Sequence, residues 1–447
     1  MAKRVNPQKI GLKERQTTFQ ETTKGLLPHQ ALAEAGRCLF CHDAPCIKSC
    51  PAGVDIANFI RKIKTRNFSG SARLIREANF LAAVCGRICP TEKQCEKGCS
   101  QSELSEPINI GALQRYVSDI EIKKINYPRP GEKKSRKIAV VGGGPAGLAA
   151  ALELTLAGYP VVVYERTDKL GGMMVWAIPD YRLPKDIVEA EIEPLKRLGI
   201  EFRYGQELGG NLNLGQLVEN YDAVILACGL IEGTKLNISG GDLTGVYSAL
   251  DFLNKVNRRD LSGINLGNRC AVIGAGSTAM DAASCARKLG TEKVLVVYRR
   301  SETEMPAARD EYEEAREIGV EFHWLTNPKR ILGNGKVEKL ECVKCELKEP
   351  DASGRPRPVE ICGSEFILDV DSVILALGQK APDNLIAEVS KVIKVEKNLP
   401  VLDKETLRSS HPRIWVAGDF ANGGKTVAQA VGEGRRAAKN IIASFNE

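Results

Sequence analysis

Apolar residues follow two different patterns, one before and one after about residue 130. In the first third they recur three or four positions apart, as in ANFIRKIKTRN and SGSARLIREANFLAAV, which predicts amphipathic helices. From residue 137 onward, short apolar runs such as IAVV and VVVYE alternate with longer stretches rich in small residues. This alternation predicts βαβ units and parallel sheets.

Two stretches show the complete order of strand, glycine turn, helix and strand, at residues 137–166 and 268–300. Three further apolar runs end at or just after a glycine, at 223–229, 372–378 and 413–419. The segment NYPRPGEKKSRK, with its prolines and charges, separates these units from the first third and predicts a linker. The fold class expected is α/β, with an N-terminal α-helical domain followed by two Rossmann-like dinucleotide-binding domains.

Composition narrows the function without deciding it. Hydrophobic residues make up 43% and charged residues 27% of the 447, an ordinary globular balance. Aromatic residues are only 5%, which does not favour nucleic-acid binding by base stacking. No apolar run is long enough to span a bilayer, and the N-terminus lacks the apolar segment of a secretion signal, so we expect a cytoplasmic protein without membrane contact.

Charge is uneven along the chain. Residues 1–134 hold 23 Lys and Arg against 13 Asp and Glu, or +10, whereas the whole chain carries +7. This basic part also holds eight of the 14 cysteines. Because disulfides are rare in the cytoplasm, so many cysteines indicate metal binding, and the nearby cations would offset the negative charge of metal-bound thiolates.

The first glycine turn is Gly142-x-Gly144-x-x-Gly147, directly after the strand IAVV. Gly142 permits the tight turn, Gly144 lets the backbone approach a pyrophosphate, and Gly147 lets the helix pack against the sheet. Glu165 closes the second strand, where its carboxylate would accept hydrogen bonds from a ribose diol. These residues predict a dinucleotide site.

The second turn is Gly274-x-Gly276-x-x-Ala279, after the strand CAVI. Here Arg299 and Arg300 stand where the first unit has its glutamate. Guanidinium groups pair with the oxygens of a 2′-phosphate, which favours NADP over NAD. Two surface arginines are also often no more than a solvated face, so the choice between the nucleotides stays open.

The stretch RIWVAGDFANGGKTVAQAVGEGRRAAKNI completes the first site. A strand delivers Gly418 and Asp419 to a turn, where the carboxylate would bind the ribityl chain of a flavin. A small-residue helix then begins near Thr426, with its positive end toward the isoalloxazine ring. We therefore expect FAD at the first site and NAD(P)H at the second.

These segments, together with residues 171–202 and 299–322, resemble a flavoprotein architecture shared by the glutamate synthase small subunit, adrenodoxin-reductase-type ferredoxin–NADP reductases and dihydropyrimidine dehydrogenase. The resemblance implies that the NAD(P) domain is inserted in the FAD domain. The expected divisions are 1–130 for the helical iron–sulfur domain, 135–255 with 370–447 for FAD, and 256–369 for NAD(P).

The cysteine block reads Cys-x2-Cys-x4-Cys-x3-Cys-Pro from Cys38 and Cys-x3-Cys-Pro-x5-Cys-x3-Cys from Cys85. Four thiolates would also suit a structural zinc ion. Iron–sulfur clusters are favoured, because a Cys-Pro ending is typical of bacterial two-cluster runs and because a flavin needs a one-electron acceptor. The pair Cys342-x-x-Cys345 has the spacing of a redox dithiol, but it lies in an alternating strand without a flavin motif and predicts a structural role.

The block resembles the N-terminal domain of dihydropyrimidine dehydrogenase, and more closely the electron-input subunit of its bacterial NAD-dependent form. The resemblance rests on CLFCHDAPCIKSCPAGVDIANFI, AAVCGRICPTEKQCEKGC and EPINIGALQRYV. It implies two [4Fe-4S] clusters, the first held by Cys38, Cys41, Cys46 and Cys99. It implies for the second the ligands Cys50, Cys89, Cys95 and Gln114. Cys85 is then a bystander, although the residues alone favour its thiolate over a neutral amide.

The function implied is transfer of a hydride from NAD(P)H to FAD and of single electrons to the clusters. No FMN barrel is present in the sequence, so the resemblance implies an FMN-containing catalytic partner that reduces uracil or thymine, in a hetero-oligomer. The alternatives are a glutamate synthase small-subunit-like donor, a stand-alone NAD(P)H–ferredoxin or disulfide reductase, and a zinc-stabilised module that binds nucleic acid.

Overall fold

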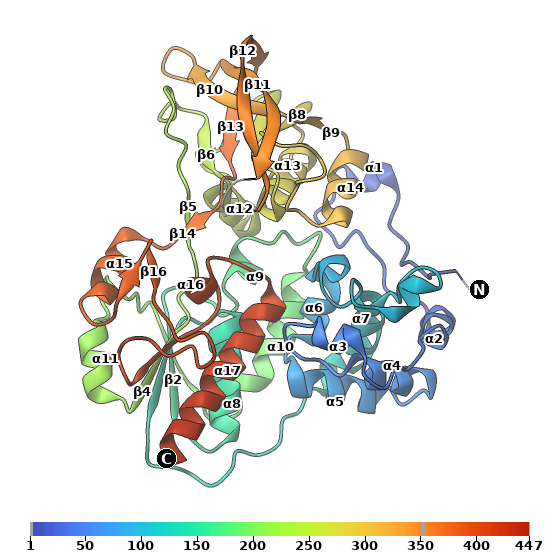
Figure 1. Ribbon diagram of the computed structural model, residues 1–447, viewed down its shortest axis with the longest axis vertical. Coiled ribbons are helices and arrows are strands. Elements are labelled where there is room, and N and C mark those ends of the chain that lie inside the picture. Colours follow the sequence, from blue (N-terminus) through green and yellow to red (C-terminus); the bar gives the residue numbers. More distant parts are fainter. Residues whose placement is uncertain (1–2, 351–353, 447) are drawn as a thin grey trace.

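A helical domain comes first along the chain in the computed structural model, which describes residues 3–350 and 354–446 (Figure 1). Each of its main helices buries one apolar face, as in α4 (Ile56–Lys64), where Phe59, Ile60 and Ile63 are buried and the Asp55 carboxylate caps the first turn. The others are α2 (Pro28–Gly36), α5 (Phe68–Ala78), α6 (Ala82–Ile88) and α7 (Ile110–Glu121). Short turns of helix connect them: α1 (Leu12–Arg15), α3 (Pro45–Lys48), η1 (Thr91–Lys93), η2 (Ser100–Glu103) and η3 (Ile122–Lys124).

The first sheet is parallel and has the strand order β17-β4-β1-β2-β3. Its strands are β1 (Ile138–Val141), β2 (Val161–Glu165), β3 (Glu201–Tyr204), β4 (Ala223–Leu226) and β17 (Ile414–Val416). The last helix, α17 (Val427–Asn446), packs closely on α8 (Pro145–Leu156), since a Cβ at Gly434 would lie 2.0 Å from the Ala146 carbonyl oxygen. Further helices are α9 (Met173–Trp176), α10 (Lys185–Lys196), α11 (Leu214–Asn220), α15 (Asp383–Ser390) and α16 (Asp419–Asn422).

The second sheet, also parallel, has the order β6-β13-β7-β8-β9. Its strands are β6 (Val246–Ser248), β7 (Arg269–Ile273), β8 (Lys293–Val297), β9 (Val320–His323) and β13 (Ser372–Leu375). Helices α12 (Ala249–Arg258), α13 (Ser277–Lys288) and α14 (Arg309–Glu317) belong to this part. An antiparallel sheet projects from it at the top of Figure 1: β10 (Thr326–Leu332), β11 (Lys339–Pro350) and β12 (Pro356–Asp369).

The second sheet is inserted into the first, because β17 follows it in the chain and returns beside β4. Two paired crossing segments, β5 (Glu232–Gly233) and β14 (Gln379–Lys380), join the two parts. β6 and β13 belong to the second sheet, whereas the expected ranges 135–255 and 370–447 placed them with the first. The pairing therefore favours boundaries near these crossing segments. The remaining short strands, β15 (Val395–Glu396) and β16 (Leu399–Pro400), form a hairpin before β17.

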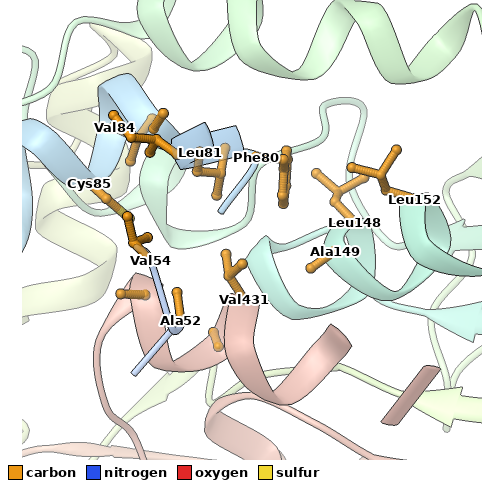
Figure 2. Close-up of a cluster of buried hydrophobic side chains, with 14 of the residues drawn as sticks. Ala52, Val54, Phe80, Leu81, Val84, Cys85, Leu148, Ala149, Leu152 and Val431 are labelled. Carbon is orange, nitrogen blue, oxygen red and sulfur yellow. The ribbon is translucent and has the colours of Figure 1, made fainter. Parts of the chain in front are cut away.

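The helical domain and the first sheet share one hydrophobic core (Figure 2). Val84 and Cys85 of α6 lie in the same cluster as Leu148 of α8 and Val431 of α17. A Cβ at Gly432 would lie 2.3 Å from the Pro51 carbonyl oxygen, so α17 is in close contact with the cysteine-bearing segment. A continuous core fixes the position of the cysteines relative to the first glycine turn.

An N-terminal arm, residues 3–24, reaches across to the second sheet's helices. Arg15 forms ion pairs of 2.6 Å with both Glu314 and Glu317, and Lys9 pairs with the same two carboxylates. The Lys288 ammonium donates a hydrogen bond to the Arg15 carbonyl oxygen. In the part of the chain that the structure describes, no helix combines the length and apolar character that a membrane span requires.

Candidate functional site

The first glycine turn has the geometry that its sequence predicts. Gly142 has φ of +112°, and a Cβ there would lie 2.2 Å from the Ala227 carbonyl oxygen, so a larger residue is excluded. A Cβ at Gly147 would lie 1.9 Å from the Gly142 carbonyl oxygen. Gly144 precedes the first turn of α8, whose backbone N–H groups face the turn. The backbone thus leaves room at a helix N-terminus for a pyrophosphate.

Glu165 lies buried at the end of β2, beside this turn. Its carboxylate accepts hydrogen bonds from the Gly143 N–H at 2.8 Å and from the N–H and hydroxyl of Thr167 at 2.8 and 2.7 Å. These contacts orient an acceptor next to the phosphate turn, where a ribose diol is expected.

The third segment of this site comes from the C-terminal part of the chain. Gly418 has φ of +72° and is followed by Asp419 at the start of α16. Burial raises the pKa of the Asp419 carboxyl, although the Lys425 N–H donates a 3.0 Å hydrogen bond to it. Glu433 of α17 accepts hydrogen bonds from the Gly418 N–H and the Asn422 amide. The α17 helix therefore fixes the turn that presents Asp419.

The second glycine turn repeats the first. Gly274 has φ of +123°, and a Cβ there would lie 2.3 Å from the Ala376 carbonyl oxygen. The two arginines after β8 differ. Arg299 is exposed, whereas Arg300 is buried and its Nε donates to the Pro356 carbonyl oxygen at 2.9 Å. Arg299 is thus the better placed of the two to contact a nucleotide phosphate.

One cavity of about 890 Å³ joins the two glycine turns. All the residues predicted for nucleotide binding line it except Gly147 and Ala279, which are packed inside α8 and α13. Residues outside the glycine motifs complete the wall, among them Met173, Trp176 and Arg355. The cavity lies in the size range of ligand and cofactor sites, and both glycine turns are in its wall.

A buried ion-pair network lines the same cavity between the two sheets. Arg182, just before α10, forms a 2.6 Å pair with Asp281 of α13 and a second pair with Glu311 of α14. The Tyr181 hydroxyl donates to the other oxygen of Asp281. The two carboxylates raise the pKa of Arg182 against the opposing effect of burial. Because Tyr181 and Arg182 belong to the first part and Asp281 and Glu311 to the second, the network fixes the two nucleotide turns relative to each other.

Four cysteines form what we call the outer group. All of them are half-buried: Cys38, Cys41, Cys46 and Cys99. Burial, together with the charges of Cys99, Cys38 and Cys41, raises the pKa of the Cys46 thiol to about 12. Such mutual effects require short separations between the sulfurs. A positive centre among them would reverse the shift and favour the thiolates.

A second set, the inner group, surrounds a small cavity. Its possible donors are Cys50, Cys85, Cys89, Cys95 and Gln114. A hydrogen bond with Cys85 and burial both raise the pKa of the Cys89 thiol. The Gln114 Nε2 donates to the Ala82 carbonyl oxygen at 2.9 Å, which leaves its Oε1 as the atom available to a metal. Five donors thus face a site for which a [4Fe-4S] cluster needs four.

The inner group lies directly beside the large cavity. Cys89 lines the small cavity, while its neighbours Ile88 and Pro90 line the large one. The Gln94 amide, next to Cys95, donates a 2.9 Å hydrogen bond to the Thr426 hydroxyl in the large cavity's wall. A single backbone segment, around Cys89, therefore separates the inner group from the large cavity.

Among residues 3–350 and 354–446, no three or more His, Cys, Asp or Glu side chains converge at single-ion distance. A tetrahedral zinc site would bring four sulfurs to about 2.3 Å from one point. Cys342 and Cys345 are buried in β11, away from the walls of both cavities.

Comparison with known proteins accounts for nearly the whole chain. Residues 15–125 match the family model described as dihydropyrimidine dehydrogenase domain II, 4Fe-4S cluster, and residues 136–434 match that of pyridine nucleotide-disulphide oxidoreductase. The NAD-dependent dihydropyrimidine dehydrogenase subunit PreT of Salmonella typhimurium is 37% identical over 95% of this chain and 97% of its own. The small chain of glutamate synthase [NADPH] of Escherichia coli is 35% identical over 98% and 96%. The chain belongs to the family of these two subunits.

Membership of this family confirms the predicted class: an NAD(P)H-dependent flavin oxidoreductase with a 4Fe-4S domain. The fold is also that of the solved Mycobacterium tuberculosis FprA in complex with NADPH, with a TM-score of 0.62 at 21% identity over 70% of this chain and 85% of that one. The predicted α/β class with its helical N-terminal domain is therefore confirmed.

Several residues of the site had no signal in the sequence. Arg182 and Gln94 act through partners far away in the chain, and Glu433 fixes the turn at Gly418, 15 positions before it. All three lie within stretches on which the resemblances rest, but no pattern in those stretches distinguishes them from their neighbours. Long-range pairs of this kind are set by packing of the domains.

Proposed function

We propose that this chain is the electron-input subunit of a two-part reductase. It takes a hydride from NAD(P)H and delivers single electrons to an FMN-containing partner of the dihydropyrimidine dehydrogenase type. The observation that carries the proposal is the shared wall between the large cavity and the inner group, formed by Pro90, Gln94 and Thr426. Because the nucleotide cavity and the inner cysteine group share this wall, electrons can pass directly from one site to the other.

The large cavity's residues define how two dinucleotides would be held. In this proposal Gly142, Gly144 and Glu165 hold the pyrophosphate and ribose of FAD, while Gly418, Asp419 and Thr426 face its ribityl chain and ring. Gly147 contributes by close packing. When bound, FAD accepts a hydride from the nicotinamide and releases the electrons singly. NAD(P)H would lie on the second turn, at Gly274, Gly276, Ala279, Arg299 and Arg300.

Two [4Fe-4S] clusters fit the two cysteine groups. The outer group would hold one through Cys38, Cys41, Cys46 and Cys99. The inner group would hold the other through Cys50, Cys89, Cys95 and Gln114. The fixed amide of Gln114 supports its assignment, because the bond to Ala82 leaves only the oxygen toward the site. Cys85 instead forms a hydrogen bond with the Cys89 thiol, as a residue beside the cluster would.

A second candidate is a subunit that uses NADPH to feed a glutamate synthase large chain. The exposed Arg299 at the cavity favours a 2′-phosphate, and the glutamate synthase relative is nearly as similar as PreT. The stretches CPAGVDI and PINIGALQ support the pyrimidine partner. The two candidates share the same internal chemistry and differ only in nucleotide and partner.

The decisive experiment uses the purified chain with its cofactors. We expect a brown protein with flavin absorption bands, whose flavin is reduced by NADH or NADPH in a stopped-flow mixer. Mixing with an FMN-containing dihydropyrimidine dehydrogenase subunit should then give nucleotide-dependent uracil reduction. A colourless zinc protein would overturn the proposal, and activity only with a glutamate synthase large chain would establish the second candidate.

A further inference from the structure

The loop between Cys38 and Cys41 presents an apolar side chain beside the outer group. Leu39 is 47% exposed and lies directly between Cys38 and Phe40 in the chain. Phe40 has φ of +50°, a conformation that bulky residues rarely adopt. In that conformation its N–H donates to the Cys38 sulfur at 3.5 Å. The strained backbone at Phe40 keeps Leu39 exposed beside the outer group. Such an arrangement suits a surface that binds another protein.

The exposed face of α4 covers this loop with positive charge. The Arg61 guanidinium and the Lys64 ammonium lie 5.3 and 5.0 Å from the centre of the Phe40 ring. Lys62 and Arg66 extend the same basic segment. Because Phe59, Ile60 and Ile63 bury the opposite face, α4 is unable to turn its cations inward.

These cations lack acidic partners. None of Arg61, Lys62, Lys64 and Arg66 forms an ion pair within residues 3–350 and 354–446, unlike Arg4, Lys9 and Arg15 of the N-terminal arm. The only acids in residues 38–66 are engaged elsewhere: Asp43 pairs with Lys48 at 2.7 Å, and Asp55 caps α4. The surface formed by Leu39, Phe40, Arg61, Lys62, Lys64 and Arg66 is called the exit patch below.

We propose that the exit patch is the docking surface for an electron-accepting protein whose own redox centre is ringed by acidic side chains. The inference rests on the proposed function, since it places the acceptor at the outer group. Unpaired cations around one exposed leucine complement an acidic rim with an apolar centre.

The electron balance of this encounter is simple. One NADH gives two electrons and a proton, so it becomes NAD⁺ while two acceptor molecules each gain one electron and one proton is released. The exit patch takes no part in the bond changes. Its cations steer the acceptor toward the outer group and accelerate association, an effect that salt screens.

The test uses two haem proteins of opposite charge as probes: cytochrome b5, which is acidic, and cytochrome c, which is basic. With the cofactor-loaded chain and NADH, we expect the second-order rate of cytochrome b5 reduction to fall with added salt. The double variant Arg61→Glu/Lys64→Glu should lower that rate about tenfold and raise the rate with cytochrome c. Leu39→Ser should lower the cytochrome b5 rate less and leave the salt slope unchanged.

A second pair, Lys62→Glu/Arg66→Glu, reverses charge without contact to Phe40, so its effect is independent of the loop's conformation. The control Lys397→Glu/Lys404→Glu changes two exposed, unpaired cations near the β15–β16 hairpin and should alter neither rate. Binding of the oxidised chain to immobilised cytochrome b5 gives a readout that does not depend on turnover, and it should weaken in both exit-patch variants.

Equal rates and equal binding for wild type and both exit-patch variants would overturn the proposal. Retardation of DNA by the wild-type chain, lost in these variants, would overturn it in favour of a nucleic-acid surface. Failure of the proposed function itself is separately visible. In that case NADH would not bleach the flavin of the wild-type chain, whereas a wrong docking surface leaves this internal reduction intact.

Discussion

The outer and inner cysteine groups have similar ligand types but opposite surroundings. The outer group lies under an exposed leucine and unpaired cations, and all its cysteines are half-buried. In the inner group Cys85, Cys95 and Gln114 are buried and Cys50 and Cys89 are half-buried. This group borders the nucleotide cavity through Pro90 and Thr426. In the proposed function this difference gives a direction to electron transfer: the inner group would face the flavin, and the outer group would face the partner.

The largest expected effect is on electron delivery, when one cysteine is replaced in each of the two groups. Cys89→Ala and Cys41→Ala should each leave about half the iron and cut electron delivery to protein acceptors by at least 100-fold, because changes to residues that merely support metal ligands already cost about 10–100-fold. Iron analysis measures the remaining iron, and the rate of acceptor reduction measures electron delivery. Flavin reduction by NADH should persist in each variant, and its loss would mean that the cysteines support the nucleotide cavity instead.

The next prediction concerns the fourth donor of the inner group. Gln114→Ala should lose iron or change the EPR signal of the inner site, whereas Cys85→Ala should keep both. The reason is that the Gln114 oxygen is directed by the bond to Ala82 while Cys85 is engaged with Cys89. If only Cys85→Ala loses iron and its EPR signal, then Cys85 is the ligand.

A third prediction tests how the inner group is attached to the flavin domain. Glu191 of α10 accepts hydrogen bonds from the N–H groups of Ala83 and Val84 at the start of α6, and burial raises its pKa to about 7. Its ordinary pKa is 4.5, so the folded state favours the protonated form. This contribution to stability is complete below about pH 4.5 and is lost as pH rises through about 7, by at most about 3 kcal/mol.

The measurement is thermal unfolding of wild type and Glu191→Gln between pH 5 and 8. The stability of wild type relative to the variant should decrease as pH rises across this window. Glu189→Gln changes an exposed carboxylate of the same helix and should show no such trend. A relative stability that increases with pH would show that the arginines Arg76 and Arg87 outweigh burial at this carboxyl.

The smallest effect is expected at the bond between the two cavities. Thr426→Val removes the hydroxyl that accepts from the Gln94 amide, which should cost about 1 kcal/mol of stability and slow cluster reduction relative to flavin reduction. Thr426→Ser retains the hydroxyl and should restore the rate in stopped-flow measurements. If the serine variant is as slow as valine, the methyl group, and not the hydrogen bond, is what matters.

Local patterns predicted the parts of this molecule that local geometry controls. The glycine turns could be predicted because Gly142 and Gly274 need a positive φ and close backbone approach, and the cysteine spacing marked the metal domain. The sheet membership of β13 could not, because a buried parallel strand has the same apolar run in either sheet.

Contacts between domains left no trace in the sequence either. Glu191 and Ala83 are 108 positions apart, and Gln94 and Thr426 are 332 apart, so neither pair creates a periodicity or motif. Arg300 shows both kinds of information: its motif position predicts a nucleotide contact and it lines the cavity, while its Nε donates to the Pro356 carbonyl oxygen of a strand that the motif does not include.

The central claim is that the inner group stands between the nucleotide cavity and the outer group. Freeze-quench EPR after mixing with NADH tests it on the two cysteine variants. In Cys41→Ala the remaining inner signal should develop at the wild-type rate. In Cys89→Ala the flavin should be reduced while the outer signal does not develop. Reduction of the outer site at the wild-type rate in Cys89→Ala would contradict the account.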